Sequence, residues 1–84
     1  INTLTLENNC LTCFDFTDNA SLGNINLSFN KINTITFPND SNLENIYIDH
    51  NNMEILDLKN QHSLVNLEAQ NNNIKKLIFL IVIN

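Results

Sequence analysis

The chain has 84 residues, of which 43% are hydrophobic, and it carries a formal net charge of −5 with only four basic residues. This composition suits a small folded domain and is too apolar for a disordered chain. The negative charge disfavours nucleic acids and anionic membranes as partners, because binding to either requires clustered positive charge. The longest apolar run, 77–83, is far shorter than the roughly 20 residues of a membrane-spanning helix.

The sequence repeats every 21 residues. An asparagine recurs at that spacing as Asn9, Asn30, Asn51 and Asn72, and it divides the chain into the repeats 1–21, 22–42, 43–63 and 64–84. Positions 1, 4, 6, 11, 14 and 16 of every repeat are apolar. This pattern predicts a single solenoid domain in which each repeat forms one coil and packs only against its neighbours. Because neither end shows a polar cap, we expect a piece of a longer array.

Each repeat is predicted to contribute one strand and one return segment. Apolar and polar residues alternate around positions 3–7, so strands are expected at 3–7, 24–28, 45–49 and 66–70, stacked in one parallel sheet. Positions 11–16 should return along the opposite side as short extended or 3-10 pieces. Phe16, Phe37 and Phe79 share one position with Leu58 and are expected to stack inside that wall. No ten-residue segment has an apolar period of 3.6, so little or no α-helix is expected.

The pattern LxxLxLxxNxL resembles the leucine-rich repeat family along the whole chain. The repeat length of 21, and second halves such as Leu56-Asp57-Leu58, look most like the bacterial internalin-type repeats. The resemblance implies a solenoid that convention assigns to the α/β class, with the parallel sheet on its concave face. It also implies protein binding and favours an extracellular or cell-surface location. Some relatives of this length carry cysteine at position 6, which here holds Leu6, Leu27, Ile48 and Ala69.

The repeated asparagine is predicted to be buried where the chain turns after each strand. A sharp turn leaves backbone N–H and C=O groups inside without partners. An amide side chain supplies both a donor and an acceptor to such groups. Asn9, Asn30, Asn51 and Asn72 are therefore expected to form a structural ladder.

Positions 3, 5, 7 and 8 are predicted to point outward on the concave face. This face is polar and acidic, it lacks lysine, and its aromatic and histidine side chains gather on the two central repeats. Exposed aromatic residues among amides and carboxylates resemble an interface hot spot. The candidate binding residues are Asn26, Ser28, Phe29, Tyr47, Asp49, His50, Glu68 and Gln70. Alternatively, Phe29 only covers its neighbours, as many single exposed apolar residues do. It is equally consistent with the sequence that the remainder of a longer parent solenoid binds the partner.

Two features look like chemical sites. The pair Cys10-x-x-Cys13 lacks the second pair of ligands that zinc needs, and the repeat offers no helix N-terminus to activate a thiol. Incidental thiols are favoured over a disulfide, and a metal site is least favoured. Asp49 and Glu68 on adjacent coils could hold a cation or form an acid–base pair, but a flat sheet encloses no cleft. We therefore expect solvated carboxylates, no cofactor, no metal and no enzymatic activity.

The sequence thus favours a module that binds a protein or peptide through its concave face. The alternative is a structural element that self-associates through uncapped solenoid ends. In that alternative the apolar segment Leu80, Ile81, Val82 and Ile83 pairs with another chain, because β-prone apolar segments at open edges promote such pairing. The same segment could instead fold back over the last coil as a hydrophobic cap.

Overall fold

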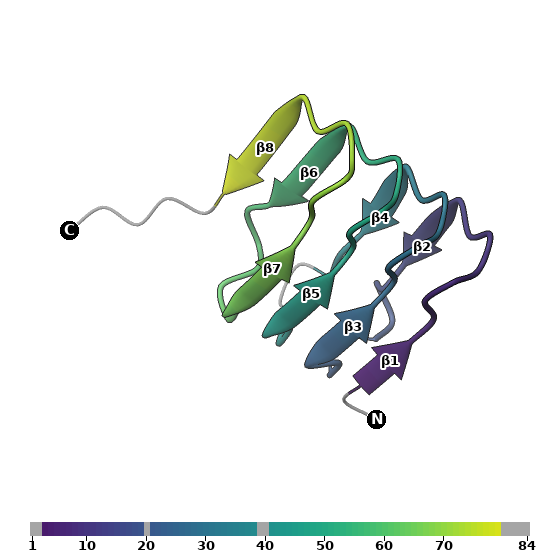
Figure 1. Ribbon diagram of the computed structural model, residues 1–84. Helices are drawn as coiled ribbons and strands as arrows, with labels where there is room; N and C mark the ends of the chain where they lie inside the picture. Colours follow the sequence, from purple (N-terminus) through teal and green to yellow (C-terminus); the bar gives the residue numbers. More distant parts are fainter. Residues whose placement is uncertain (1–2, 20, 39–40, 80–84) are drawn as a thin grey trace.

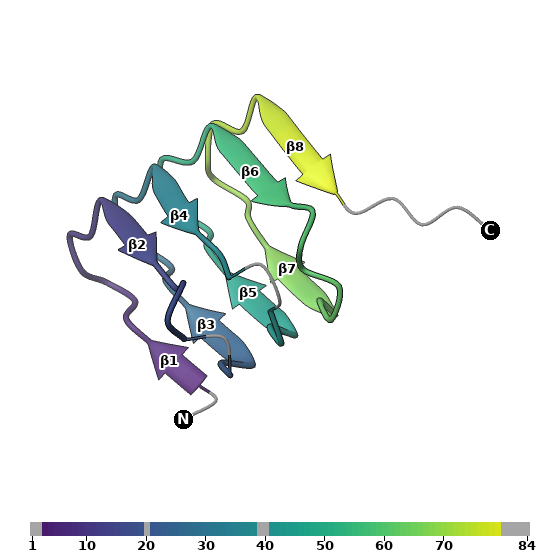
Figure 2. The same cartoon turned by 180° about the vertical axis from the view of Figure 1, so that it is seen from behind.

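The computed structural model describes residues 3–19, 21–38 and 41–79. Within these residues the chain forms eight short strands and no helix. Figures 1 and 2 show the strands in two facing walls, which the chain visits alternately as it winds through successive coils. The predicted solenoid with a parallel sheet is confirmed. Ile1 and the segment Leu80–Ile83 lie outside the described residues.

One wall is a continuous parallel sheet, which we call the concave sheet after the face that the resemblance implies. Its strands, in order, are β1 (Thr3–Thr5), β3 (Asn24–Asn26), β5 (Asn45–Tyr47) and β7 (Asn66–Glu68). Each strand pairs with the next one 21 residues later, so that Ile25 lies opposite both Leu4 and Ile46. The middle residue of each strand points inward, and Ile25 and Ile46 are fully buried. This alternation is the pattern that the sequence predicts for a sheet with one buried face.

The opposite wall, the return wall, is extended but not continuous. It consists of β2 (Cys13–Asp15), β4 (Thr34–Thr36), β6 (Ile55–Leu58) and β8 (Lys76–Phe79). Strand β2 pairs with β4 and β6 pairs with β8, but β4 and β6 are not paired. A backbone hydrogen bond of 2.9 Å from Asn52 to Ile32 joins these two coils just before the strands begin. We call the unpaired boundary between β4 and β6 the seam.

The core lies between the two walls. Among the described residues, the buried leucine, isoleucine, phenylalanine and methionine side chains all occupy the six positions that the repeat predicts to face inward: Phe16, Leu22, Ile25, Leu27, Ile32, Leu43, Ile46, Ile48, Met53, Leu56 and Leu58. The Phe16 and Phe37 rings stack at 6.0 Å between centroids. The prediction was wrong at the last coil, where Leu77 and Phe79 are 45% and 55% exposed. The described residues place no further coil beyond them, and a solenoid coil is covered only by its neighbours.

Asn51 fastens its coil to the preceding one. Its Oδ1 accepts a hydrogen bond from the Ile32 N–H at 3.0 Å, and its Nδ2 donates to the Leu27 carbonyl at 2.9 Å. Within its own coil, Nδ2 also donates to the carbonyls of Ile48 and Asp49, each at 3.1 Å. The side chain is buried, so these bonds satisfy backbone groups that water does not reach.

Asn30 and Asn72 make the corresponding contacts one coil earlier and one coil later. Asn9 is exposed and donates only to the carbonyls of Leu6 and Glu7 in its own coil. Among the described residues no coil precedes Asn9, so it has no earlier turn to join. The linking role therefore falls to the later three asparagines.

We expect Asn51→Ala to lower the free energy of unfolding by about 1–3 kcal/mol, because it leaves buried backbone groups without partners. The matched control is Asn52→Ala, which removes an exposed amide from the next residue and should change little. Urea denaturation of both variants measures the difference. Equal losses of stability would contradict the linking role of Asn51.

Gln61 is a buried side chain whose polar atoms have no partner. It is 6% exposed, and neither its Oε1 nor its Nε2 forms a hydrogen bond. Because an unpaired buried amide is destabilising, we expect Gln61→Met to raise the free energy of unfolding by about 1–3 kcal/mol. The control Gln70→Met alters an exposed glutamine and should have almost no effect. A destabilised Gln61→Met chain in urea denaturation would show that the amide finds partners in solution.

Candidate binding site on the concave face

The concave sheet ends in the same unusual turn in every coil. Asn8, Phe29, His50 and Asn71 all have φ between 57° and 60°. Asparagine tolerates this left-handed conformation, whereas for most residues it costs about 1–2 kcal/mol. Phenylalanine and histidine are therefore uncommon choices at this position, and they occupy it in the two central coils. Asn8 and Asn71, in the first and last coils, are the residues from which the sequence could have indicated this turn.

Phe29 and His50 form a ring stack on adjacent coils. Their ring centroids lie 4.1 Å apart, with an angle of 12° between the planes. Phe29 remains 50% exposed, so one face of the pair is open to solvent. Phe29 thus covers its neighbour, as the alternative interpretation held, and also leaves an aromatic surface exposed to solvent.

A chain of hydrogen bonds holds the histidine in place. The Ser28 hydroxyl donates to Oδ1 of Asp49, and Oδ2 of Asp49 lies 2.9 Å from Nδ1 of His50. On the far side of the ring, Nδ2 of Asn71 lies 3.1 Å from Nε2 of His50. A neutral imidazole that carries its proton on Nδ1 satisfies both contacts, because Nδ1 then donates and Nε2 accepts. The network links three successive coils.

Ser28 and Asp49 are less accessible than the sequence predicts. They are only 7% and 8% exposed, although their position in the repeat was expected to point outward. The period-two rule does not consider the neighbouring coil, to which each of these side chains is bonded. Burial raises the pKa of Asp49, but the hydrogen bonds from Ser28 and His50 outweigh it, and the pKa lies below its usual value. Asp49 therefore acts mainly as a support for the ring stack.

The other candidate residues lie on the sheet beside this network. Tyr47 is partly buried, and its neighbours in the sheet are Asn26 on one side and Glu68 on the other. Nδ2 of Asn26 lies 3.4 Å from a carboxylate oxygen of Glu7. Gln70 and Glu68 are exposed, and the amide donates to the carboxylate at 3.4 Å. The eight candidate residues thus lie on β3, β5 and β7 or directly after them.

A row of asparagine amides crosses the concave sheet at the start of its strands. Nδ2 of Asn66 donates to Oδ1 of Asn45 at 2.6 Å, and Asn45 donates in turn to Asn24. Asn24 donates to the Thr3 hydroxyl at 3.4 Å. The repeat pattern placed these residues on the concave face but did not predict the row of hydrogen bonds. Asparagine at position 3 of three successive repeats was a signal for it, because side chains opposite each other on paired strands interact.

In this arrangement the Ser28 hydroxyl is not activated as a nucleophile. The Ser28 hydroxyl donates to Asp49, while the accepting nitrogen of His50 faces Asn71, so the imidazole is not placed to take the serine proton. Within the described residues, no group of three histidine, cysteine or acidic side chains could hold a metal ion. Cys10 and Cys13 are exposed free thiols.

Comparison with known proteins gives no match at any of three levels. No protein-family model matches the chain, and no curated protein or solved structure is significantly similar to it. The described part of the chain also contains no helix that is long and apolar enough to cross a membrane.

The lowered pKa of Asp49 stabilises the fold above about pH 4, where the carboxyl is ionised in both the folded and the unfolded chain. That stability is lost as the pH falls through the folded pKa. Because Ser28→Ala removes a donor to the carboxylate, we expect the pKa of Asp49 to rise, as measured by NMR titration of its carboxyl carbon.

The matched control is Thr17→Val. The Thr17 hydroxyl donates to Asp15, whose pKa is also lowered, chiefly by this bond. Thr17→Val should raise the pKa of Asp15 and leave that of Asp49 unchanged. An Asp49 titration that Ser28→Ala does not move would contradict the network.

Proposed function

We propose that this chain is an interaction module of the leucine-rich-repeat type that binds a protein or peptide through its concave face. The observation that carries the proposal is the half-exposed stack of Phe29 on His50, held in a left-handed backbone conformation. Backbone conformations of this kind persist where the surrounding structure enforces them, and they gather at binding and catalytic sites. Exposed aromatic anchors supported from behind are also typical of binding hot spots.

The charge of the concave face favours a basic partner. Glu7, Asp49 and Glu68 lie on it, and its outward positions hold no lysine or arginine. A face of one charge attracts and orients a partner of the opposite charge. A segment that presents arginine fits best, because a guanidinium stacks on aromatic rings and also pairs with carboxylates.

Binding without catalysis is the proposed activity. The side chains with reactive groups on this face are already engaged with one another, as Ser28 is with Asp49. The tyrosine and the open face of the ring stack are free to make contacts of the kind found in recognition surfaces.

The proposal is tested with peptides selected from a displayed library on the immobilised chain. We expect Phe29→Asn and Tyr47→Ala each to weaken binding of a selected peptide by about tenfold or more. Asparagine suits the backbone conformation of residue 29, so that variant keeps the turn while it removes the ring.

The control for this experiment is Phe79→Ala, which removes a ring of similar exposure from the return wall. It should leave the affinity unchanged, and circular dichroism should show that all three variants keep their fold. Peptides whose binding ignores both concave-face substitutions would argue against this site.

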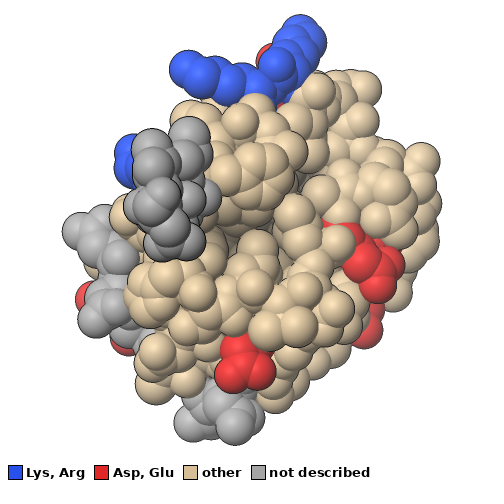
Figure 3. All heavy atoms as spheres, turned by 90° about the vertical axis from the view of Figure 1, so that its left-hand side faces the viewer, with Lys and Arg blue, Asp and Glu red and all other residues tan. Residues whose placement is uncertain are grey.

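Self-association is a second candidate, and the two ends of the solenoid favour it. At the last coil Leu77 and Phe79 are exposed. At the first coil a hollow of about 440 Å³ is lined in part by Leu4, Phe14 and Leu22. Figure 3 shows the molecule from the side on which β7 and β8 lie in Figure 1, where most of the visible surface is uncharged. A head-to-tail contact between such ends would build open filaments.

Light scattering over a range of concentrations separates the two candidates. Self-association through the ends predicts a mass that rises with concentration and falls back to that of a monomer in the double variant Leu77→Ser, Phe79→Ser. Removal of residues 80–83, which lie outside the described residues, tests the predicted contribution of that segment. A monomer at every concentration would exclude this second candidate.

A further inference from the structure

The seam is hollowed along its length. Two hollows, of about 410 and 270 Å³, lie between the second and third coils and share Ile35, Phe37 and Asp57 as lining residues. Because they share these lining residues, the two hollows adjoin, and we call them together the groove between β4 and β6. The larger hollow falls within the range of about 300–1,000 Å³ that ligand sites occupy.

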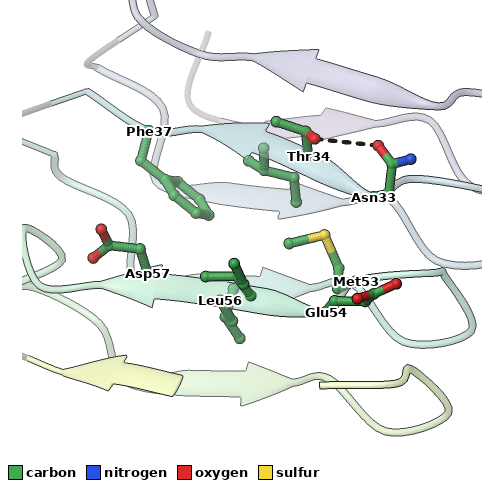
Figure 4. Close-up of a pocket in the computed structure, with 9 residues that line it drawn as sticks. Asn33, Thr34, Phe37, Met53, Glu54, Leu56 and Asp57 are labelled. Carbon is green, nitrogen blue, oxygen red and sulfur yellow. Dashed lines mark hydrogen bonds between the residues drawn. The ribbon is translucent and has the colours of Figure 1, made fainter. Parts of the chain in front are cut away.

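The floor of the larger hollow is apolar. Met53 and Leu56 belong to the buried core, and Ile35 and Phe37 are partly buried against it. Figure 4 shows the side chains of Phe37 and Met53 in the space between the two strands. An apolar side chain placed here would extend the core and would be removed from water.

The two strands that border the groove are each paired on one side only. Strand β4 bonds to β2 and β6 bonds to β8, and no backbone hydrogen bond joins β4 to β6. Open strand edges bind additional extended chains unless charged residues, proline or bulges protect them. The sequence of β4, Thr34-Ile35-Thr36, contains neither a charge nor a proline. An extended peptide therefore meets an unprotected edge on β4, whereas the edge of β6 carries one charged residue, Asp57.

Gln61 indicates which chemistry the groove accepts. Gln61 is one of the residues that line the smaller hollow, and its amide is almost completely buried and has no hydrogen-bond partner. An amide side chain offers one acceptor and two donors, which match the N–H and C=O of a peptide group. A purely hydrocarbon ligand would leave that amide unpaired, whereas a peptide would satisfy it.

We propose that the seam is a second binding site, which takes an extended peptide segment. The peptide places an apolar side chain over Met53 and Leu56, bonds through its backbone to the edges of β4 and β6, and pairs one peptide group with Gln61. The site lies on the wall opposite the concave face, and it does not rest on the function proposed for that face.

The probe is the blocked peptide acetyl-Thr-Val-Thr-Val-Thr-amide, titrated into the isotope-labelled full chain and followed by NMR. We expect saturable shifts of the backbone amides of Ile35, Phe37, Ile55 and Asp57. The control peptide carries proline in place of the central threonine, which removes a backbone donor and disfavours strand addition. It should cause no saturable shifts at these residues. Absence of binding, or shifts confined to Phe29 and its neighbours on the concave face, would overturn the proposal.

A pair of variants then tests the role of the amide. Gln61→Met should weaken binding of the same peptide by about two- to tenfold, as expected for one lost hydrogen bond. Gln70→Met, on the concave face, should bind as the unmodified chain does. Equal affinity of all three chains would overturn the assignment of Gln61. Phe29→Asn should not affect this titration, so failure at the seam is distinguishable from failure of the concave site.

Discussion

A chain that turns sharply after every strand leaves backbone donors and acceptors inside the fold, and here one amide per coil pairs with them. Asn51 accepts from one backbone group of the preceding coil and donates to another, so it joins two coils as well as closing its own turn. These asparagine hydrogen bonds recur every 21 residues, the same interval at which residues of neighbouring strands pair. Burial of the apolar positions stabilises the stack of coils, whereas the asparagine hydrogen bonds determine which turns pair with each other.

That register also creates the candidate site. Residues 21 positions apart lie beside each other on the concave sheet, so the spacing of the repeat brings Phe29 against His50 and Ser28 against Asp49. None of these side chains needs a loop or an insertion to reach its partner. The unfavourable conformation of residue 29 is tolerated because the coils on either side hold the turn, and the ring is presented outward as a consequence.

The sequence predicted what a single coil and its immediate repeat determine. Apolar periodicity located the concave strands and the core of the central coils. The burial of Asp49 was not predicted, because it depends on a hydrogen bond to another coil. The exposure of Phe79 was not predicted either, because it depends on what packs against the last coil and not on the repeat pattern. The seam could not be read from the repeat at all, since Ile35 and Leu56 occupy the same repeat position as the paired residues of the other coils. A pattern common to all coils carries no information about the one boundary that differs.

The difference between the two walls bears on what the molecule can do. In a solenoid each coil contacts only its neighbours. Where two coils are not paired in one wall, other contacts between the same two coils must therefore hold them together. Between the second and third coils that support comes from the pairing of β3 with β5 and from Asn51, which reaches Leu27 and Ile32. The strands β4 and β6 therefore do not need to pair for these two coils to stay together. A ligand that enters between β4 and β6 would displace no backbone bond of the fold, and the concave face would keep its register while the seam is filled.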